Sequence, residues 1–149
     1  MTTSLGEIEI LARGVMVRRG MLLVCHSRRK KNYFLPGGHV DLGERAKAAL
    51  AREIEEEIGL PCSVGRFLGA TEHAYLYRRE RIFEVNLLFV MRVRGLTVSR
   101  PVPSREPKLE FLWLPLSKLL ESKLEPFSLR EDLPRWLKNL TSDRWSSTL

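Results

Sequence analysis

Residues 37–60 read GGHVDLGERAKAALAREIEEEIGL, and this stretch decides the fold. It begins with two adjacent glycines, which permit a tight turn and close approach of the backbone to a ligand. Residues 46–58 contain neither proline nor glycine and almost no β-branched residue, so we expect a helix of about three turns. Gly59 and Pro61 are suited to end it. The stretch therefore predicts a glycine turn that leads into a helix.

One face of this helix is acidic. Glu53, Glu56 and Glu57 lie at spacings i, i+3 and i+4, which place them side by side. No lysine or arginine in residues 53–60 relieves their mutual repulsion. A hard divalent cation with oxygen ligands, Mg²⁺ or Mn²⁺, would do so. The glutamates alone leave open a solvated acidic face with no ligand. The apolar residues expected to face a core are Ala51, Ile54 and Ile58.

The spacing from Gly38 onward decides between these interpretations. Five residues separate Gly38 from Glu44, seven separate Glu44 from Arg52, and the sequence REIEEEIGL follows. This pattern resembles the signature of the Nudix hydrolase family, G-x5-E-x7-R-E-hydrophobic-x-E-E-x-G-hydrophobic, at every specified position. The preceding Leu35 and Pro36 are also similar to the family. The resemblance implies an α/β (α+β) fold, a sandwich of helix, mixed central sheet and helix with a loop–helix–loop signature.

The resemblance implies a Mg²⁺- or Mn²⁺-dependent hydrolase that cleaves the diphosphate linkage of a nucleoside diphosphate derivative. Glu56 and Glu57 match the principal metal ligands of the family. Glu53 matches either a further ligand or the general base that activates water. A backbone carbonyl near the start of the turn, of Gly37 or Gly38, matches another metal ligand.

Two further signature residues have supporting roles in the family. Arg52 matches an orienting residue that forms an ion pair with a signature glutamate. Glu44 matches a residue that holds the turn against the helix and approaches the metal through water. Glu55 occupies an unspecified position, and we expect it to be solvated.

Contacts to the rest of the substrate lie outside the signature, where the sequence gives candidates but no motif. The basic residues before the turn belong to a loop that precedes the proposed site. Polar residues in the later strand-like runs would approach it if their sheet faces the helix. In the family, a loop glutamate downstream can also complete the metal site or act as base. The candidates are Arg28, Arg29, Glu72, Glu84, Asn86 and Glu106, with Glu110 as an alternative to Glu106.

The remaining elements follow from apolar runs and turn residues. Two runs joined at Gly20 predict a hairpin, and two longer runs flank a charged turn at residues 78–81. The second of the longer runs is apolar on both sides, which indicates a central strand. The sequence after residue 140 carries no packing signal and is expected to fray. The predicted strands are residues 7–18, 21–26, 63–77, 82–93 and 111–116, and the predicted later helices are residues 117–121 and 129–140.

Composition indicates an ordinary globular protein. The 149 residues are 44% hydrophobic and 29% charged, which suits a single domain over residues 1–149. No apolar run has the length needed to span a bilayer, and the N-terminal segment lacks the pattern of a secretory signal. Cys25 and Cys62 do not suggest a disulfide framework, so we expect reduced thiols in the cytoplasm.

The formal net charge of +7 is compatible with phosphorylated ligands, but the basic residues are dispersed. The expected partner is a small-molecule nucleotide. Nucleoside triphosphates and an RNA 5′ end are alternative substrates, and RNA binding would be sensitive to salt. A non-catalytic nucleotide-sensing protein is an alternative of another class, which the intact signature disfavours. The resemblance also allows a homodimer, and the sequence leaves the substrate open.

Overall fold

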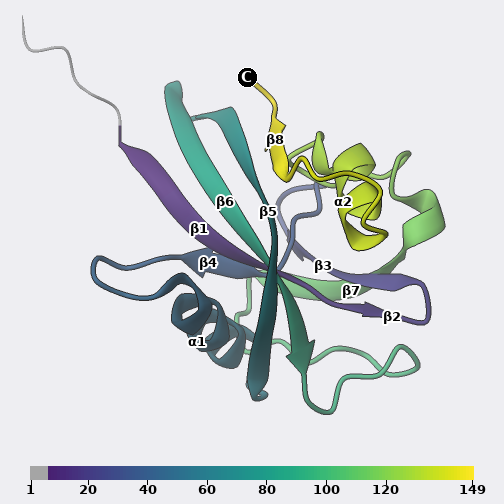
Figure 1. The fold of residues 1–149 in the computed structure, drawn as a ribbon. Helices are drawn as coiled ribbons and strands as arrows, with labels where there is room; N and C mark the ends of the chain where they lie inside the picture. Colours follow the sequence, from purple (N-terminus) through teal and green to yellow (C-terminus); the bar gives the residue numbers. More distant parts are fainter. Residues whose placement is uncertain (1–6) are drawn as a thin grey trace, which may run out of the picture.

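The computed structural model describes residues 7–149. Part of the N-terminal segment, on which the expected absence of a secretory signal rests, therefore lies outside the described residues. Two α-helices pack against two sheets (Figure 1). The elements are, in order, β1 (Ile8–Val15), β2 (Val17–Arg18), β3 (Met21–Ser27), β4 (Gly37–His39), α1 (Ala46–Ile58), β5 (Cys62–Tyr77), β6 (Glu80–Val93), β7 (Leu109–Pro115), the 3₁₀ helix η1 (Leu116–Lys118), α2 (Leu129–Leu137) and β8 (Trp145–Ser147).

The large sheet is mixed, as expected. Its strand order is β4-β1-β6-β5-β8, with β1 parallel to β6, β5 parallel to β8, and the other two pairs antiparallel. The prediction that residues 82–93 form a central strand is confirmed, because β6 lies in the middle of this sheet. A smaller antiparallel sheet has the order β2-β3-β7.

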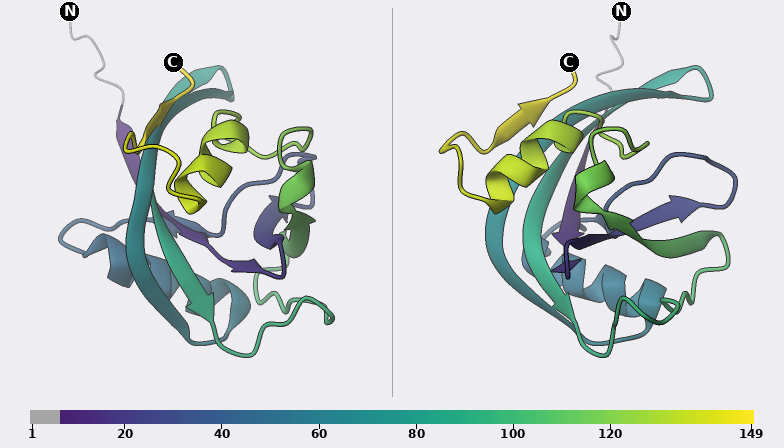
Figure 2. Two further views of the ribbon diagram at one scale, coloured as in Figure 1. Left: turned by 45° about the vertical axis from the view of Figure 1, so that its right-hand side comes forward. Right: turned by 90° about the vertical axis from the view of Figure 1, so that its right-hand side faces the viewer.

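The two helices lie on opposite sides of the large sheet (Figure 2), which confirms the sandwich of helix, sheet and helix. One core joins α1 to one face of this sheet, and the other joins α2 to the opposite face. Both cores also receive residues from β3, with Leu23 and Cys25 on one side and Leu22 and Val24 on the other. No helix among the described residues has the length and apolar character needed to cross a membrane.

Helix α1 has the predicted bounds. Gly59 ends it in the left-handed region, with φ 83°, and donates its N–H to Glu55 O at 2.9 Å. The buried face differs slightly from the expected one, because Ala51 is only half-buried. The fully buried residues of α1 are Ala49, Leu50, Ile54 and Ile58.

The predicted strand over residues 7–18 is in fact two strands in different sheets. The break falls at Met16, which is buried and accepts a hydrogen bond from Leu23 N at 3.0 Å. Only β2 and β3 form the expected hairpin, around Arg19 and Gly20, both at positive φ. The apolar run hid this break because Met16 is as apolar as its neighbours.

The prediction that the tail frays was wrong. Strand β8 pairs in parallel with β5, and Thr148 N donates to Glu72 O at 3.2 Å. The tail is also held by Trp136, whose Nε1 donates to Asp143 O at 2.9 Å and whose carbonyl accepts from Arg144 Nη1 at 2.8 Å. These contacts are made by backbone groups and single side chains. They produce no periodic pattern of apolar residues in the sequence, so the sequence did not predict them. The last two helices are shorter than predicted, at Leu116–Lys118 and Leu129–Leu137.

Close packing of α2 on β5 gives a first testable prediction. A Cβ at Gly69 would lie 2.5 Å from Cζ3 of the buried Trp136 ring. We expect Gly69→Ala to lower the free energy of unfolding by about 1–3 kcal/mol, measured by urea denaturation, because overpacking strains the core. Gly65→Ala in the same strand is the control, since its nearest neighbour, Val90 O, lies 3.3 Å away. Equal effects of the two substitutions would contradict this account of the packing.

Candidate active site

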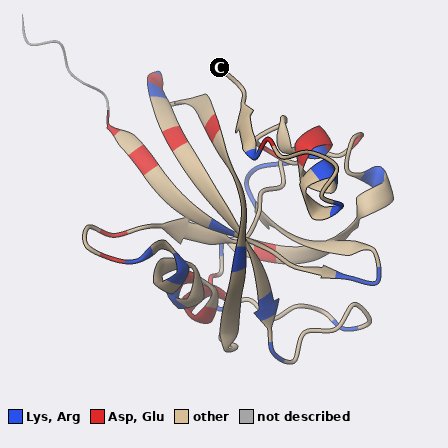
Figure 3. Cartoon of the chain, viewed as in Figure 1, with Lys and Arg blue, Asp and Glu red and all other residues tan. Residues whose placement is uncertain are grey.

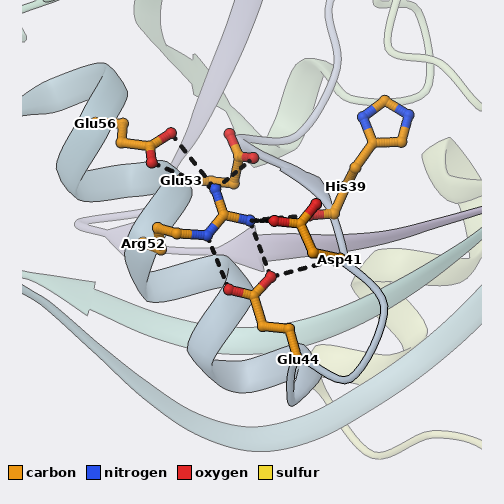
Figure 4. Close-up of polar contacts among 6 residues, drawn as sticks. All are labelled: His39, Asp41, Glu44, Arg52, Glu53 and Glu56. Carbon is orange, nitrogen blue, oxygen red and sulfur yellow. Dashed lines mark hydrogen bonds and ion pairs between the residues drawn. The ribbon is translucent and has the colours of Figure 1, made fainter.

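The Arg52 guanidinium joins the glycine turn to helix α1 (Figure 4). Its Nε and Nη2 donate to the two carboxylate oxygens of Glu44 at 2.8 and 2.9 Å, which is a bidentate pair. Its Nη1 donates to Glu53 Oε1 at 3.1 Å. Nη2 also donates to His39 O at 3.3 Å and lies 3.5 Å from Asp41 Oδ2. One side chain therefore fixes the turn on the helix.

The same contacts set the ionisation of Glu44. Hydrogen bonds from Arg52 hold the pKa of this carboxyl at about 2, well below its usual range. The carboxylate also accepts a hydrogen bond from Asp41 N at 3.2 Å. Glu44 in return raises the pKa of Arg52. The pair is therefore ionised throughout the neutral range.

Glu53 and Glu57 form an acidic pair on helix α1. Both side chains are half-buried. Burial, together with the neighbouring Glu53 carboxylate, raises the pKa of Glu57 to about 8. Glu53 lies directly against the Gly38 backbone, where any Cβ would overlap its carboxyl group. The glycine at position 38 is therefore required for this approach, and two carboxyl groups meet beside the turn.

Glu56 differs from this pair. Its side chain is 59% exposed, and Arg52 Nη1 lies 3.4 Å from its Oε1. Among the described residues, no group of three or more His, Cys, Asp or Glu side chains is already placed to hold a metal ion. The three glutamates share a helix face as predicted, but they do not form a closed ligand set by themselves.

A cavity of about 570 Å³ lies on the α2 side of the large sheet. Arg13 lines it, and its Nε donates to Asn86 Oδ1 and its Nη1 to Leu35 O, both at 3.1 Å. Asn86 Nδ2 donates in turn to Glu84 Oε1 at 3.0 Å. The predicted residues Glu84 and Asn86 are both buried and line this cavity. We call it the substrate cavity.

Arg13 also belongs to the strand that pairs with the glycine turn. Its Cα pairs with that of Gly37 in the turn. Burial lowers the pKa of Arg13, while the charges of Glu84 and Glu57 act in the opposite direction. The negative charges of Glu84 and Glu57 therefore both favour the charged form of the Arg13 guanidinium.

Aromatic side chains form much of the wall of the substrate cavity. His73 and Tyr75 stack with ring centroids 5.7 Å apart, and Arg13 lies over the Phe34 ring at 5.5 Å from its centroid. His73 is held by Thr148, with 2.7 Å between Nδ1 and Oγ1. Flat aromatic surfaces with a few convergent polar groups are suited to a nucleobase.

Some predicted residues lie away from the substrate cavity. Arg28 and Arg29 are exposed, and Arg28 lines a separate hollow. Glu72 pairs with Val85, whereas His73 pairs with Glu84. Since side chains alternate along a strand, Glu72 points to the opposite face of the sheet.

The two downstream glutamates also have different positions. Glu106 is exposed, and its Oε1 accepts a hydrogen bond from Lys108 N at 3.3 Å. Its neighbour Arg105 donates its N–H to Glu57 O at 2.6 Å, so this loop touches the end of α1. Glu110 Oε2 lies 3.0 Å from His26 Nε2. Glu106 therefore follows a residue that is hydrogen-bonded to the end of the acidic helix.

Sequence reasoning missed Arg13 as a member of the site. The available signal was the position of Arg13 in the middle of the run EIEILARGVMVR, because a charge inside a strand with buried neighbours needs a partner. That its side chain faces a cavity follows only from the pairing of β1 with β6.

The Arg52–Glu44 pair generates a prediction about stability. Because the folded pKa of Glu44 is depressed from 4.5 to about 2, its contribution is full above the unfolded pKa and is lost as pH falls toward 2. We expect Glu44→Gln to lower Tm by about 2–4 °C between pH 5 and 8, with a difference that shrinks below pH 4.5. The measurement is thermal unfolding against pH. Glu55→Gln, on an exposed helix position, should change Tm little, and equal losses in both variants would argue against the pair.

Comparison with known proteins agrees with this geometry. A family model described as the NUDIX domain matches residues 10–139. An ADP-ribose pyrophosphatase of Methanocaldococcus jannaschii is 27% identical over 128 residues, covering 83% of this chain and 71% of the relative. MutT4 of Mycobacterium tuberculosis is 30% identical over 106 residues, covering 71% of this chain and 38% of the relative. Diphosphoinositol polyphosphate phosphohydrolase 2 of Rattus norvegicus is 32% identical over 71 residues, covering 48% and 40%. The chain spans about two fifths of the length of the last two proteins.

Solved structures show the same fold at low identity. The MutT protein from Methanosarcina mazei Go1 has a TM-score of 0.69 at 20% identity, covering 94% of this chain and 100% of that one. A UDP-X diphosphatase has a TM-score of 0.66 at 16% identity, covering 97% and 70%. With its family match over residues 10–139 and this shared architecture, the chain belongs to the NUDIX domain family.

Proposed function

We propose that the protein hydrolyses the diphosphate linkage of a nucleoside diphosphate derivative with the help of Mg²⁺ or Mn²⁺. The observation that carries the proposal is the Glu53 carboxyl group against the Gly38 backbone, with Glu57 one turn further along the helix. Arg13, which lines the substrate cavity, pairs with Gly37 of the same turn. Two relatives support the substrate class, because they are named as an ADP-ribose pyrophosphatase and a UDP-X diphosphatase. The cavity volume of about 570 Å³ is in the range of small-molecule sites.

The residues fit a hard divalent cation. Glu53, Glu56 and Glu57 supply carboxylate oxygens, and a backbone carbonyl of Gly37 or Gly38 supplies another oxygen from the turn. Burial and like charge disfavour ionised Glu57, so added positive charge would stabilise its anionic form. Oxygen atoms of the substrate phosphates and of water would supply the remaining ligands of the cation. When bound, the cation would offset phosphate charge and lower the pKa of a coordinated water.

The protein groups then have separate tasks. Glu53 takes a proton from the attacking water, or it serves as a metal ligand. The water oxygen forms a bond to phosphorus as the bond from phosphorus to the bridging oxygen breaks, which leaves two phosphate-bearing products. Arg52 keeps Glu53 in place through its 3.1 Å hydrogen bond. Arg13 donates to a phosphate oxygen from the cavity side.

The same chain has features that bear on its organisation. We infer a single domain, because each hydrophobic core takes residues from both sheets. Cys25 and Cys62 are free thiols, and we propose a cytoplasmic location, where thiols stay reduced. A homodimer stays a prediction.

The acidic pair is tested by a substrate panel with Mg²⁺ or Mn²⁺. It contains ADP-ribose, nucleotide sugars, dinucleoside polyphosphates, nucleoside triphosphates and 5′-triphosphorylated RNA. We expect one preferred class, and we expect Glu53→Gln and Glu57→Gln to lower kcat by about 10²–10⁴-fold. The control is Glu55→Gln, an exposed glutamate of the same helix.

Calorimetric titration with Mn²⁺ separates the roles of Glu53. Intact binding with low kcat in Glu53→Gln identifies the base, whereas weakened binding identifies a ligand. Normal turnover in that variant would exclude both roles. No turnover of any panel member with metal binding intact would favour a nucleotide-sensing function.

Arg13 is tested on the preferred substrate. We expect Arg13→Lys to lower kcat/KM by about 10- to 100-fold, because lysine keeps the charge but loses the planar fork that binds Asn86, Leu35 and a phosphate together. Arg92→Lys, on an exposed position of β6, is the matched control. Urea denaturation of both variants accounts for any loss of stability. Unchanged kinetics in Arg13→Lys would remove Arg13 from the site.

A further inference from the structure

A second hollow, of about 720 Å³, adjoins the substrate cavity. We call it the basic hollow, because five cationic residues and one carboxylate, Glu121, line it. The substrate cavity is balanced by comparison, with two cationic residues, Arg13 and Lys30, and two carboxylates, Glu84 and Glu125. The cationic residues of the basic hollow are Arg28, Lys30, Lys31, Lys118 and Lys123.

The walls of the basic hollow come from two segments far apart in the sequence. Tyr33 joins them, because its N–H donates to Lys123 O at 3.0 Å and its carbonyl accepts from Glu125 N at 2.8 Å. The second wall is braced by Ser122 Oγ, which donates to Leu119 O at 2.6 Å. The backbone that carries the cations is therefore held in place on both sides.

The cations of the basic hollow carry uncompensated charge. Lys30 Nζ lies over the Tyr77 ring at 5.8 Å from its centroid, which does not neutralise the ammonium group. Within residues 7–149, none of the five forms an ion pair with a carboxylate. Lysine and arginine elsewhere are spread over many separate elements (Figure 3). Folding thus gathers like charges around one concave surface, and such a surface attracts anions of opposite charge.

The basic hollow and the substrate cavity form a continuous surface. Lys30 and Tyr33 line both of them. A ligand in the substrate cavity can therefore extend past these two residues into the hollow. A small nucleotide derivative whose only phosphates are those of the scissile linkage would leave the hollow unused.

We propose that the basic hollow binds phosphate groups of the substrate that lie beyond the linkage being cleaved. The proposal rests on the proposed function, because it takes the neighbouring cavity as the place of the nucleotide. The ligand chemistry is a chain of phosphates or phosphodiesters, such as the 5′ end of an oligonucleotide. Several exposed cations acting together give binding that depends steeply on salt.

The test is a binding measurement without divalent metal, so that no hydrolysis is needed. The first probe is a short, fluorescently labelled 5′-triphosphorylated RNA, followed by anisotropy. We expect Lys118→Gln/Lys123→Gln to raise Kd by at least about 10-fold and to reduce the slope of log Kd against log salt by about 1.4. The control is Arg92→Gln/Arg94→Gln, which removes the same charge from exposed positions outside both cavities.

A second probe, inorganic tripolyphosphate, distinguishes the sources of phosphate. Loss of affinity for both probes in the lysine variant assigns a phosphate chain, and loss for RNA alone assigns the sugar–phosphate backbone; either result supports the site. Equal weakening by the two double variants, or no binding of either probe by the unmodified protein, overturns it. Urea denaturation checks that the variants fold. Failure of the proposed function appears separately, as absence of hydrolysis across the panel while binding persists.

Discussion

The fork of hydrogen bonds from Arg52 is the contact on which the site depends. Glycine-rich turns have no side chains with which to fix their position, and a helix face with several glutamates repels itself. Arg52 addresses both difficulties, because it binds Glu44 on the turn side and Glu53 on the helix side. The Glu53 carboxyl group can then lie against Gly38, where no other residue type leaves room.

Features with local causes could be predicted from the sequence, and those that arise from tertiary pairing could not. The bounds of α1 follow from helix propensity and from Gly59, so Ala46–Ile58 was predicted without error. Glu72 and Glu84 were equal candidates because only strand register decides which face each occupies. The tail was misjudged for a related reason, since β8 is held by backbone pairing and by Arg144 rather than by an apolar stripe.

The large sheet separates two environments, and β1 takes part in both. Ala12 faces the core that contains α1, whereas the next residue, Arg13, turns toward the substrate cavity. This alternation is the ordinary period of a strand. It lets a single strand support the acidic helix on one face and place a guanidinium on the other.

The contact between His73 and Thr148 has a consequence for how such proteins diverge. His73 lines the substrate cavity, and the residue that orients it belongs to the last few positions of the chain. Thr148 lies outside the signature, so a substitution there leaves the residues of the catalytic helix unchanged. Drift in the tail can therefore alter the wall that meets the ligand while the signature stays constant. Relatives with identical signatures can in this way come to prefer different ligands while their signature residues stay the same.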